Sequence, residues 1–485
     1  MTILRGVARN IGVLAASRVV MWVAAFAFTI AQARYLGPGR FGELSVALTY
    51  AALLSIVVDF GLGTQLSRMV AQRSRGHEDA LAATIAVRAG LWLAAVPWLW
   101  LLTVAFAYGP ELQETILILA VSVLLIGASN TIASFLQGRE EFVLPSIAAA
   151  AQGLTAAGVG MVVLVSRPDI TAIADAFVLA AAVNLAVLLL DRRARQWLRS
   201  RTDARAALGL LRSAVPLGIY AIATTFYFGV DMVMLERLLP PENVGWYAAA
   251  YRPFGTATIL PAIVAGTVLY PVLSRLSLGS RDELRAVIAK ALTVLTLAGV
   301  AIALVFALFA ERIVGLLYPA HSYAEAAVAL RLLAPGLVFI YLNWVFATAL
   351  LGLGQERRLV VMALATAVLN PLMNLAAIPL FQQTGAAFVT SLTELVVLVW
   401  LVRMMPRDLV RLESLRVGVK ALAAAGIAAL LLVPLREQPL MVSAPAAITL
   451  YAAGALALRT ITTRELVALG AVVLPLRPAA RGEAR

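Results

Sequence analysis

The chain has 485 residues, of which 62% are hydrophobic and only 13% charged, and its formal net charge is +13. The hydrophobic residues form about fourteen runs of roughly 20 residues, the length of helix that spans a hydrocarbon core of ~30 Å. Because no long polar stretch remains, this composition excludes a soluble enzyme and predicts an all-α polytopic membrane protein.

The residue types also exclude several kinds of site. Basic residues lie in short loops between apolar runs and are not interleaved with aromatic residues, so no nucleic-acid partner is expected. Cysteine is absent and His77 and His321 are the only histidines, which argues against a disulfide, a thiol nucleophile or a metal centre. The chain has no phosphate-binding loop of the ATPase type and no hydrolase motif. We therefore expect no catalytic residue, no metal and no cofactor.

Fourteen transmembrane spans are predicted in chain order. The first apolar run is too long for a signal peptide and lacks a small-residue cleavage pattern, so it is predicted to be an uncleaved span. The predicted spans are residues 11–33, 43–66, 82–107, 113–136, 145–166, 171–190, 209–235, 244–273, 287–309, 325–353, 359–379, 384–402, 417–434 and 440–458.

Basic residues are distributed very unequally between alternate loops. One set of loops, which includes both termini, holds about 30 Lys and Arg residues against about 7 in the other set, and loops rich in these residues stay in the cytoplasm. Both termini are therefore predicted to be cytoplasmic, in a multi-pass protein of the cytoplasmic (inner) membrane. This orientation requires an even number of spans.

A basic linker and a weak internal repeat divide the chain. The linker covers residues 191–206, and residues 34–44 (RYLGPGRFGEL) recur as residues 237–247 (RLLPPENVGWY) before the eighth span. A second pair, Gly138-Arg-Glu and Gly354-Gln-Glu, follows spans four and ten. We expect two six-helix lobes, residues 1–190 and 207–404, related by a parallel pseudo-repeat with an axis along the membrane normal. Helices 13 and 14 (405–458) and a cytoplasmic tail (459–485) complete the prediction.

Two arginines are predicted to lie inside spans, where charge is costly and marks a functional site by default. Arg18 lies about eight residues into span one, roughly 12 Å deep at 1.5 Å per residue. Arg252 precedes Pro253 in span eight at a similar depth from the opposite face. A guanidinium binds phosphate through paired N–H donors, so both are candidates for an anionic headgroup. For Arg18, snorkelling to the cytoplasmic headgroups is the alternative.

Acidic and amide side chains are also predicted within spans. Asp59, Asp231 and Glu394 are interpreted either as structural partners or as coupling-ion ligands, and the sequence does not decide between these roles. Asn370 and Asn374 are one helical turn apart in span eleven and so share a face. They are candidates for substrate binding, with bonding to a neighbouring helix as the alternative.

Several ordered motifs resemble one family. They are Ala33-Arg-Tyr-Leu-Gly-Pro-Gly-Arg-Phe-Gly, Asp59-Phe-Gly-Leu-Gly, Asp231 with Val244-Gly-Trp-Tyr, Gly352-Leu-Gly-Gln, Asn370-Pro-Leu-Met-Asn, Ile378-Pro and Gly385-Ala-Ala. Over residues 11–458 their order resembles the oligosaccharide flippases of bacterial polysaccharide and O-antigen assembly, which belong to the multidrug/oligosaccharidyl-lipid/polysaccharide exporter superfamily.

The resemblance implies two lobes that open alternately to each side of the membrane. The substrate it implies is a polyprenyl-diphosphate-linked oligosaccharide for surface polysaccharide or lipopolysaccharide, with Arg18 and Arg252 contacting the diphosphate. It also implies functional coupling to glycosyltransferases and a polymerase, contacts with membrane lipids and a possible coupling ion. Lipid II flippases of the superfamily have an arginine at the position of Arg18 and a second about a turn and a half later, where this chain has Ala24.

Besides a lipid II flippase of the same superfamily, which Ala24 disfavours, two alternatives stay open. An ion-coupled multidrug-type antiporter of the same superfamily would rely on acidic cavity residues, often in span one, where this chain has none. A membrane-embedded glycosyltransferase or polymerase would need a large extramembrane loop, whereas the longest predicted outer connection, about residues 310–325, is short. A transporter is therefore expected, and not an enzyme.

Overall fold

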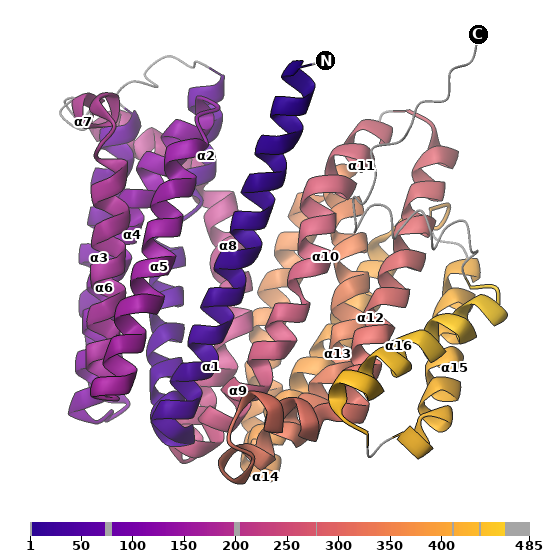
Figure 1. Ribbon diagram of the computed structural model, residues 1–485. Coiled ribbons are helices and arrows are strands. Elements are labelled where there is room, and N and C mark those ends of the chain that lie inside the picture. Colours follow the sequence, from indigo (N-terminus) through magenta and orange to yellow (C-terminus); the bar gives the residue numbers. More distant parts are fainter. Residues whose placement is uncertain are drawn as a thin grey trace. The chain divides into compact units, whose positions relative to one another are not determined.

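The computed structural model describes residues 2–72, 80–197, 204–277, 279–409, 412–435 and 438–460, and for residues 2–22 it describes the backbone alone. Every regular element in these ranges is helical (Figure 1), which confirms the predicted all-α membrane fold. The chain divides into two compact units. Unit 1 comprises Met1–Ala250, Val314–Ala326 and Val360–Val389, and unit 2 comprises Tyr251–Ile313, Ala327–Leu359 and Thr390–Arg485.

The helices follow one another with short connections. They are α1 (Thr2–Asp59), α2 (Leu62–Ala71), α3 (Ala80–Ala105), α4 (Pro110–Gly138), α5 (Val143–Ser166), α6 (Ile170–Leu188), α7 (Arg192–Trp197), α8 (Ala204–Leu238), α9 (Pro241–Ala257), α10 (Ile259–Ile263), α11 (Tyr270–Leu276), α12 (Arg281–Leu317), α13 (Ala320–Gly352), α14 (Glu356–Met404), α15 (Leu412–Leu431) and α16 (Leu440–Ala457). A π-helical stretch, Val264–Leu269, joins α10 to α11, and a short 3-10 helix, Val433–Leu435, follows α15.

Eleven helices within the described ranges are long and apolar enough to cross a membrane. Two of these segments, Val23–Ala71 and Glu356–Met404, have 49 residues each, or about 73 Å of helix, more than twice the hydrocarbon thickness. Each contains a non-helical residue at a predicted loop: Gly37 has φ of 73° and Gln382 has φ of 54°. The predicted count of fourteen spans stays a prediction.

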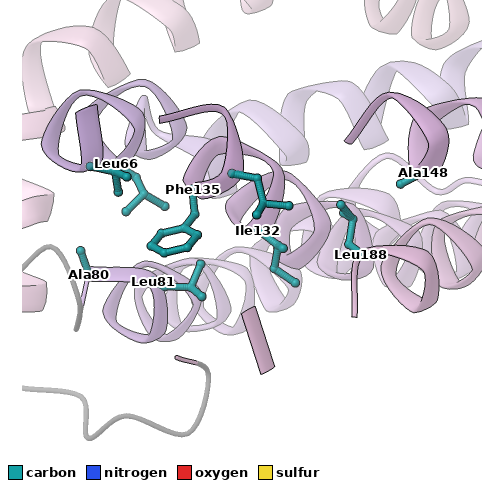
Figure 2. Close-up of a cluster of buried hydrophobic side chains, with 9 residues drawn as sticks. Leu66, Ala80, Leu81, Ile132, Phe135, Ala148 and Leu188 are labelled. Carbon is teal, nitrogen blue, oxygen red and sulfur yellow. The ribbon is translucent and has the colours of Figure 1, made fainter. Parts of the chain in front are cut away.

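Unit 1 is built around α4, which packs against α1, α2, α3 and α6, while α5 packs against α6 and α1. A buried cluster fills one end of this bundle, and Figure 2 shows the ring of Phe135 among Leu66, Leu81 and Ile132. The full cluster is Leu66, Val70, Ala80, Leu81, Ile132, Phe135, Leu136, Ala148 and Leu188. Lipid tails are as apolar as leucine, so close packing of this kind, more than the hydrophobic effect, holds such helices together.

The two copies of the repeated segment pack directly against each other within unit 1. A methyl group at Gly42 would lie 2.3 Å from the carbonyl oxygen of Pro241, and one at Gly245 would lie 1.9 Å from the carbonyl oxygen of Pro38. Neither distance leaves room for any side chain. Glycine is therefore required at both positions for the segments to approach this closely.

A third segment binds to the same end of unit 1. The guanidinium of Arg34 donates hydrogen bonds of 2.6 Å to the carbonyl oxygens of Leu316 and Leu317, and the hydroxyl of Tyr323 donates one of 2.8 Å to the carbonyl of Ala33. Trp246 Nε1 donates a further bond of 2.8 Å to the Ser322 carbonyl, and Asn243 Nδ2 donates one of 2.6 Å to the side-chain Oε1 of Gln383, which lies outside this segment. We call residues 33–44, 241–247 and 316–323 the junction. It joins segments that the sequence assigns to different halves of the chain.

Unit 2 contains a second close-packed core. Helices α12, α15 and α16 meet through mostly small side chains, and this allows their backbones to approach closely. The buried members are Val300, Leu304, Ala421, Ala424, Ala428, Tyr451 and Ala455. An ion pair of 3.1 Å between Arg281 and Asp408 lies at the start of α12. Residues predicted as the last two spans therefore contribute to the core of this unit.

Two connections contain helix that the sequence analysis does not predict. The described part of the basic linker at residues 191–206 contains helix α7. The predicted outer connection at about residues 310–325 is largely helical as well, because α12 continues to Leu317 and α13 begins at Ala320. In both places the backbone N–H and C=O groups form hydrogen bonds within a helix. The division into two six-helix lobes remains a prediction.

Candidate functional site

The two predicted phosphate-binding arginines lie on helices of different units. Arg18 lies in α1 of unit 1, and its side chain falls outside the described part of the chain. Arg252 lies in α9 at the start of unit 2, partly exposed and directly before Pro253. Thr256 Oγ1 donates a hydrogen bond of 2.8 Å to the carbonyl of Arg252. A joint site of both arginines therefore stays a prediction.

The two predicted amide residues form a pair inside unit 1. Asn374 Nδ2 donates a hydrogen bond of 2.9 Å to Oδ1 of Asn370, one turn earlier on α14, and both side chains are buried. Oδ1 of Asn374 is buried without a hydrogen-bond partner in the described ranges. An unpaired buried acceptor of this kind costs about 1–3 kcal/mol. The pair therefore offers one free acceptor at a position within the span.

Asp59 forms an ion pair with Arg88 of α3. The Arg88 side chain is 2% exposed and that of Asp59 is 34% exposed. Arg88 Nη1 also donates hydrogen bonds of 2.6 Å to the Gly127 carbonyl and to Thr131 Oγ1 of α4. This geometry supports the structural interpretation of Asp59, because its charge neutralises a buried guanidinium.

Two glycines make room for this ion pair. A methyl group at Gly63 would lie 3.1 Å from Nη2 of Arg88 and 3.3 Å from Oδ1 of Asp59, and one at Gly127 would lie 3.9 Å from Cδ of Arg88. The side chain of Arg88 can therefore pass between α2 and α4 without displacing either helix.

Asp231 is a buried acceptor in unit 1. The hydroxyl of Tyr247, on α9, donates a hydrogen bond to Oδ2 of Asp231, and the backbone N–H of Met232 donates one of 2.9 Å to Oδ1. Tyr247 is fully buried and Asp231 is 4% exposed. Each carboxylate oxygen thus has a donor from the protein.

Glu394 is a buried acceptor in unit 2. Asn343 Nδ2, on α13, donates a hydrogen bond of 2.8 Å to Oε2 of Glu394 and one of 3.1 Å to its backbone carbonyl. Both side chains are buried. Asp231 and Glu394 therefore each link two helices through a hydrogen bond.

Sequence reasoning missed the partners of all three acidic residues: Arg88, Tyr247 and Asn343. Arg88 lies only six residues inside the predicted span 82–107, and the criterion that selected Arg18 would also have selected it. Tyr247 and Asn343 are uncharged residues of types that are common in membrane helices. No pattern in the sequence distinguishes them as partners.

A hollow of about 440 Å³ opens beside the junction in unit 1. Three carboxylates, Glu43, Glu111 and Glu236, line it together with Arg237. Tyr108 also lines it, and its hydroxyl lies 3.0 Å from the hydroxyl of Tyr50. Burial raises the pKa of Tyr108, so its hydroxyl remains protonated and can donate a hydrogen bond. The described residues contain no group of three or more acidic or histidine side chains suited to hold a metal ion.

Two family models match the chain. The model described as polysaccharide biosynthesis protein matches residues 7–277, more than half of the length, and the model described as MatE matches residues 216–376. A search of curated protein sequences finds no match.

Solved structures share the fold at low sequence identity. The lipid II flippase MurJ, in an inward closed conformation, aligns with a TM-score of 0.76 and 13% identity, covering 94% of this chain and 99% of MurJ. A multidrug resistance MATE family transporter in an inward-facing conformation aligns with a TM-score of 0.62 and 15% identity over 78% of this chain and 92% of the transporter. A MOP superfamily transporter from Pyrococcus furiosus aligns with a TM-score of 0.53 and 15% identity over 80% and 92%. These likenesses establish the fold.

Proposed function

Since the chain belongs to the polysaccharide biosynthesis protein family, within the multidrug/oligosaccharidyl-lipid/polysaccharide exporter superfamily of membrane transporters, we propose that it flips a polyprenyl-diphosphate-linked oligosaccharide across the cytoplasmic membrane. The observation that carries this proposal is the family match over residues 7–277. That stretch contains both Arg18 and Arg252. The substrate so delivered would serve the synthesis of a cell-surface polysaccharide or lipopolysaccharide.

The junction supports transport by alternating access. It joins residues 33–44 to residues 241–247 and 316–323 through the bonds of Arg34, Trp246 and Tyr323. These segments belong to opposite predicted lobes, so the junction keeps one end of the pathway closed. Opening that end requires these hydrogen bonds and the contacts of Gly42 and Gly245 to separate. A transporter needs such a barrier, because a pathway open at both ends would leak.

The predicted site residues contact different parts of the substrate. Arg18 and Arg252 contact the diphosphate, because a guanidinium offers paired donors to phosphate oxygens. The buried Asn370–Asn374 pair contacts sugar hydroxyls through Oδ1 of Asn374, which has no hydrogen-bond partner in the described ranges. The hydrogen bonds of Asp231 and Glu394 favour a structural role for both, so energy coupling to an ion, if it occurs, would use other groups.

The orientation follows from the charge bias of the loops. Both termini lie in the cytoplasm, and the junction lies at the opposite face of the membrane. The chain moves its substrate without converting it chemically, and it acts between glycosyltransferases that build the lipid-linked sugar and a polymerase that uses it. Two six-helix lobes carry the movement.

Translocation in proteoliposomes tests the proposal. The purified chain is reconstituted, and a radiolabelled polyprenyl-diphosphate oligosaccharide is added to one side. We expect movement to the other leaflet that Arg18→Ala/Arg252→Ala abolishes and that Arg18→Lys/Arg252→Lys retains in part, because lysine keeps the charge but loses the paired donors. Translocation that is unaffected by the alanine double variant would refute the phosphate site.

The same preparation tests two other substrates. The MatE match to residues 216–376 favours a multidrug-type antiporter as the second candidate. Export of a cationic dye, without movement of the lipid-linked sugar, would assign the chain to that class. Movement of lipid II alone would assign it to the lipid II flippases, although Ala24 stands where the resemblance implies a second arginine.

A further inference from the structure

Helices α2 and α4 form a polar hollow of about 430 Å³ in unit 1, and none of its described lining residues is a predicted substrate residue. Its lining is Gly63, Thr64, Ser67, Arg68, Ala71, Ser134 and Gln137. Pockets that bind small ligands have volumes of about 300–1,000 Å³. The hollow is therefore large enough for a phosphate group with a substituent.

The polar side chains of this hollow have no hydrogen-bond partner among the residues that the structure describes. Thr64, Ser67, Arg68, Ser134 and Gln137 make no side-chain hydrogen bond or ion pair within the described residues. Thr64, Arg68 and Gln137 are exposed, whereas Ser67 and Ser134 are partly buried. Five neighbouring side chains thus keep their hydrogen-bonding capacity for a ligand or water.

Two glycines hold the base of the hollow in a fixed geometry. A methyl group at Gly138 would lie 2.7 Å from the carbonyl oxygen of Ser67, and one at Gly63 would lie 3.1 Å from Oγ of Ser134. Gly138 of α4 therefore lies against the backbone of α2, and Gly63 of α2 lies against the side chain of Ser134. These contacts bring Ser67 and Arg68 of one helix close to Ser134 and Gln137 of the other.

The charge of the hollow suits an oxyanion. Arg68 supplies up to five N–H donors, the three hydroxyls supply one donor each and Gln137 supplies two. The described lining residues include no carboxylate. Asp59 also lies close to Gly63, but its charge is paired with Arg88. The other formal charge of this lining is the cation of Arg68, which forms no ion pair with a described residue.

From this set of donors we propose that the α2–α4 hollow binds the phosphate group of a lipid at the membrane surface. Arg68 lies in the last turn of α2, two residues after the predicted end of span two, at the depth of lipid headgroups. The charge bias predicts that this end faces the cytoplasm. The phosphate belongs either to a bilayer phospholipid or to the diphosphate of the lipid-linked substrate, and only the second source rests on the proposed function.

Calorimetric titration of the full-length chain in a neutral detergent tests the site. The probes are dihexanoylphosphatidic acid, geranyl diphosphate and inorganic phosphate, with dihexanoylphosphatidylcholine as the zwitterionic comparison. We expect Arg68→Gln to weaken binding of the tighter lipid phosphate by about tenfold or more, the effect of losing one charge-assisted contact. Ser134→Ala should weaken it by about threefold, because one hydroxyl donor is lost.

Arg275→Gln is the matched control. Arg275 is also an exposed arginine in the last turn of a helix, α11, and follows the eighth span as Arg68 follows the second. Both variants remove the same charge and the same interaction with a helix C-terminus. Arg275→Gln should leave the affinity unchanged.

The outcomes distinguish the two sources of phosphate, and they include results that would overturn the proposal. Tighter binding of phosphatidic acid identifies a bilayer phospholipid, and tighter binding of geranyl diphosphate identifies the lipid-linked substrate. Equal weakening by Arg68→Gln and Arg275→Gln would show general surface charge and overturn the proposal, as would inorganic phosphate binding as tightly as both lipids. If Arg68→Gln fails to fold, an unchanged affinity in both Ser134→Ala and Gln137→Leu overturns it.

Discussion

Gly42 and Gly245 hold the same place in the two copies of the repeated segment, and each lies against the carbonyl of the proline four residues before the other. The contact is therefore reciprocal: Gly42 meets Pro241, and Gly245 meets Pro38. Reciprocity of this kind is expected when two copies of one motif face each other across a twofold axis. It gives the weak sequence repeat a structural counterpart.

Alanine at either glycine should destabilise the chain. The added methyl group would lie 2.3 Å or less from a backbone oxygen, and a backbone cannot move aside as a flexible side chain can. We expect Gly42→Ala and Gly245→Ala each to cost about 1–3 kcal/mol, the usual effect of overpacking. Thermal unfolding in detergent measures this cost.

Gly39→Ala is the control for the junction. A methyl group there would lie 3.4 Å from Oε1 of Glu242, the far end of a flexible side chain. Its unfolding temperature should match that of the unmodified chain. Equal effects at Gly39 and Gly42 would contradict the role assigned to the close contact.

Removing one member of the Asp59–Arg88 pair should have unequal consequences. Asp59→Leu leaves a guanidinium that is 2% exposed without its counterion, and breaking a buried pair in this way costs about 3–5 kcal/mol. Arg88→Met leaves a carboxylate that is 34% exposed and can be hydrated, so its cost should be smaller. Unfolding of both variants in the same detergent gives the comparison.

The double variant Asp59→Leu/Arg88→Met completes this experiment. With both charges absent, no uncompensated charge remains, so the double variant should be more stable than Asp59→Leu alone. If the destabilisation of the double variant equals the sum for the two single variants, Asp59 and Arg88 do not interact as described.

Asp169, at the start of α6, should make the stability of the folded chain depend on pH. Its Oδ1 accepts hydrogen bonds from the backbone N–H of Thr171 at 2.9 Å and from its hydroxyl at 2.7 Å, and the hydroxyl bond is the main cause that lowers the pKa of Asp169 below 3.8. Because the folded pKa is below the unfolded one, the contribution is complete above pH ~4 and disappears as the pH falls through the folded pKa. Stability measured from pH 6 down to pH 3 shows this loss.

Two substitutions separate the cap from its charge. Asp169→Ala removes the helix cap and should cost about 1 kcal/mol at pH 6. Asp169→Asn keeps an oxygen that caps the helix but does not titrate, so its stability should be near that of the unmodified chain and should lose this acid dependence. The same acid dependence in the Asn variant would assign it to other carboxylates.

Glu394→Gln should preserve both folding and transport. The glutamine side-chain oxygen can still accept the 2.8 Å hydrogen bond from Asn343 Nδ2. Glu394→Ala leaves Asn343 with the backbone carbonyl alone and should cost about 1–3 kcal/mol. Transport assayed with and without an ion gradient distinguishes the roles: a Gln variant that folds but loses its response to the gradient would show that Glu394 couples transport to an ion.

The sequence predicts the fold because a membrane allows few arrangements of a hydrophobic chain. Spans of fixed length follow from hydrophobicity, and the kinks at Gly37 and Gln382 fall where loops were predicted. The resemblance to the flippases of the exporter superfamily is confirmed by the family matches and by the shared fold. The helical parts of the two polar connections were missed, because local charge says little about backbone hydrogen bonding near a membrane surface.

The site could be predicted only as a set of residue types. Asp59, Asp231 and Glu394 stand out because charge inside a span is rare. Their partners depend on which helices lie side by side, and this depends on packing between segments far apart in the chain. Tyr247 is selected as the donor to Asp231 only by the contact of α8 with α9.

The reciprocal contact at Gly42 and Gly245 has a consequence for the origin of the chain. A surface that fits a second copy of itself is the defining property of the interface in a symmetric homodimer. A shorter chain with a single copy of the motif could pair with an identical molecule through the same two glycines and prolines. Gene duplication and fusion would then turn an association between molecules into a permanent connection within one polypeptide, free to diverge everywhere except where the copies meet.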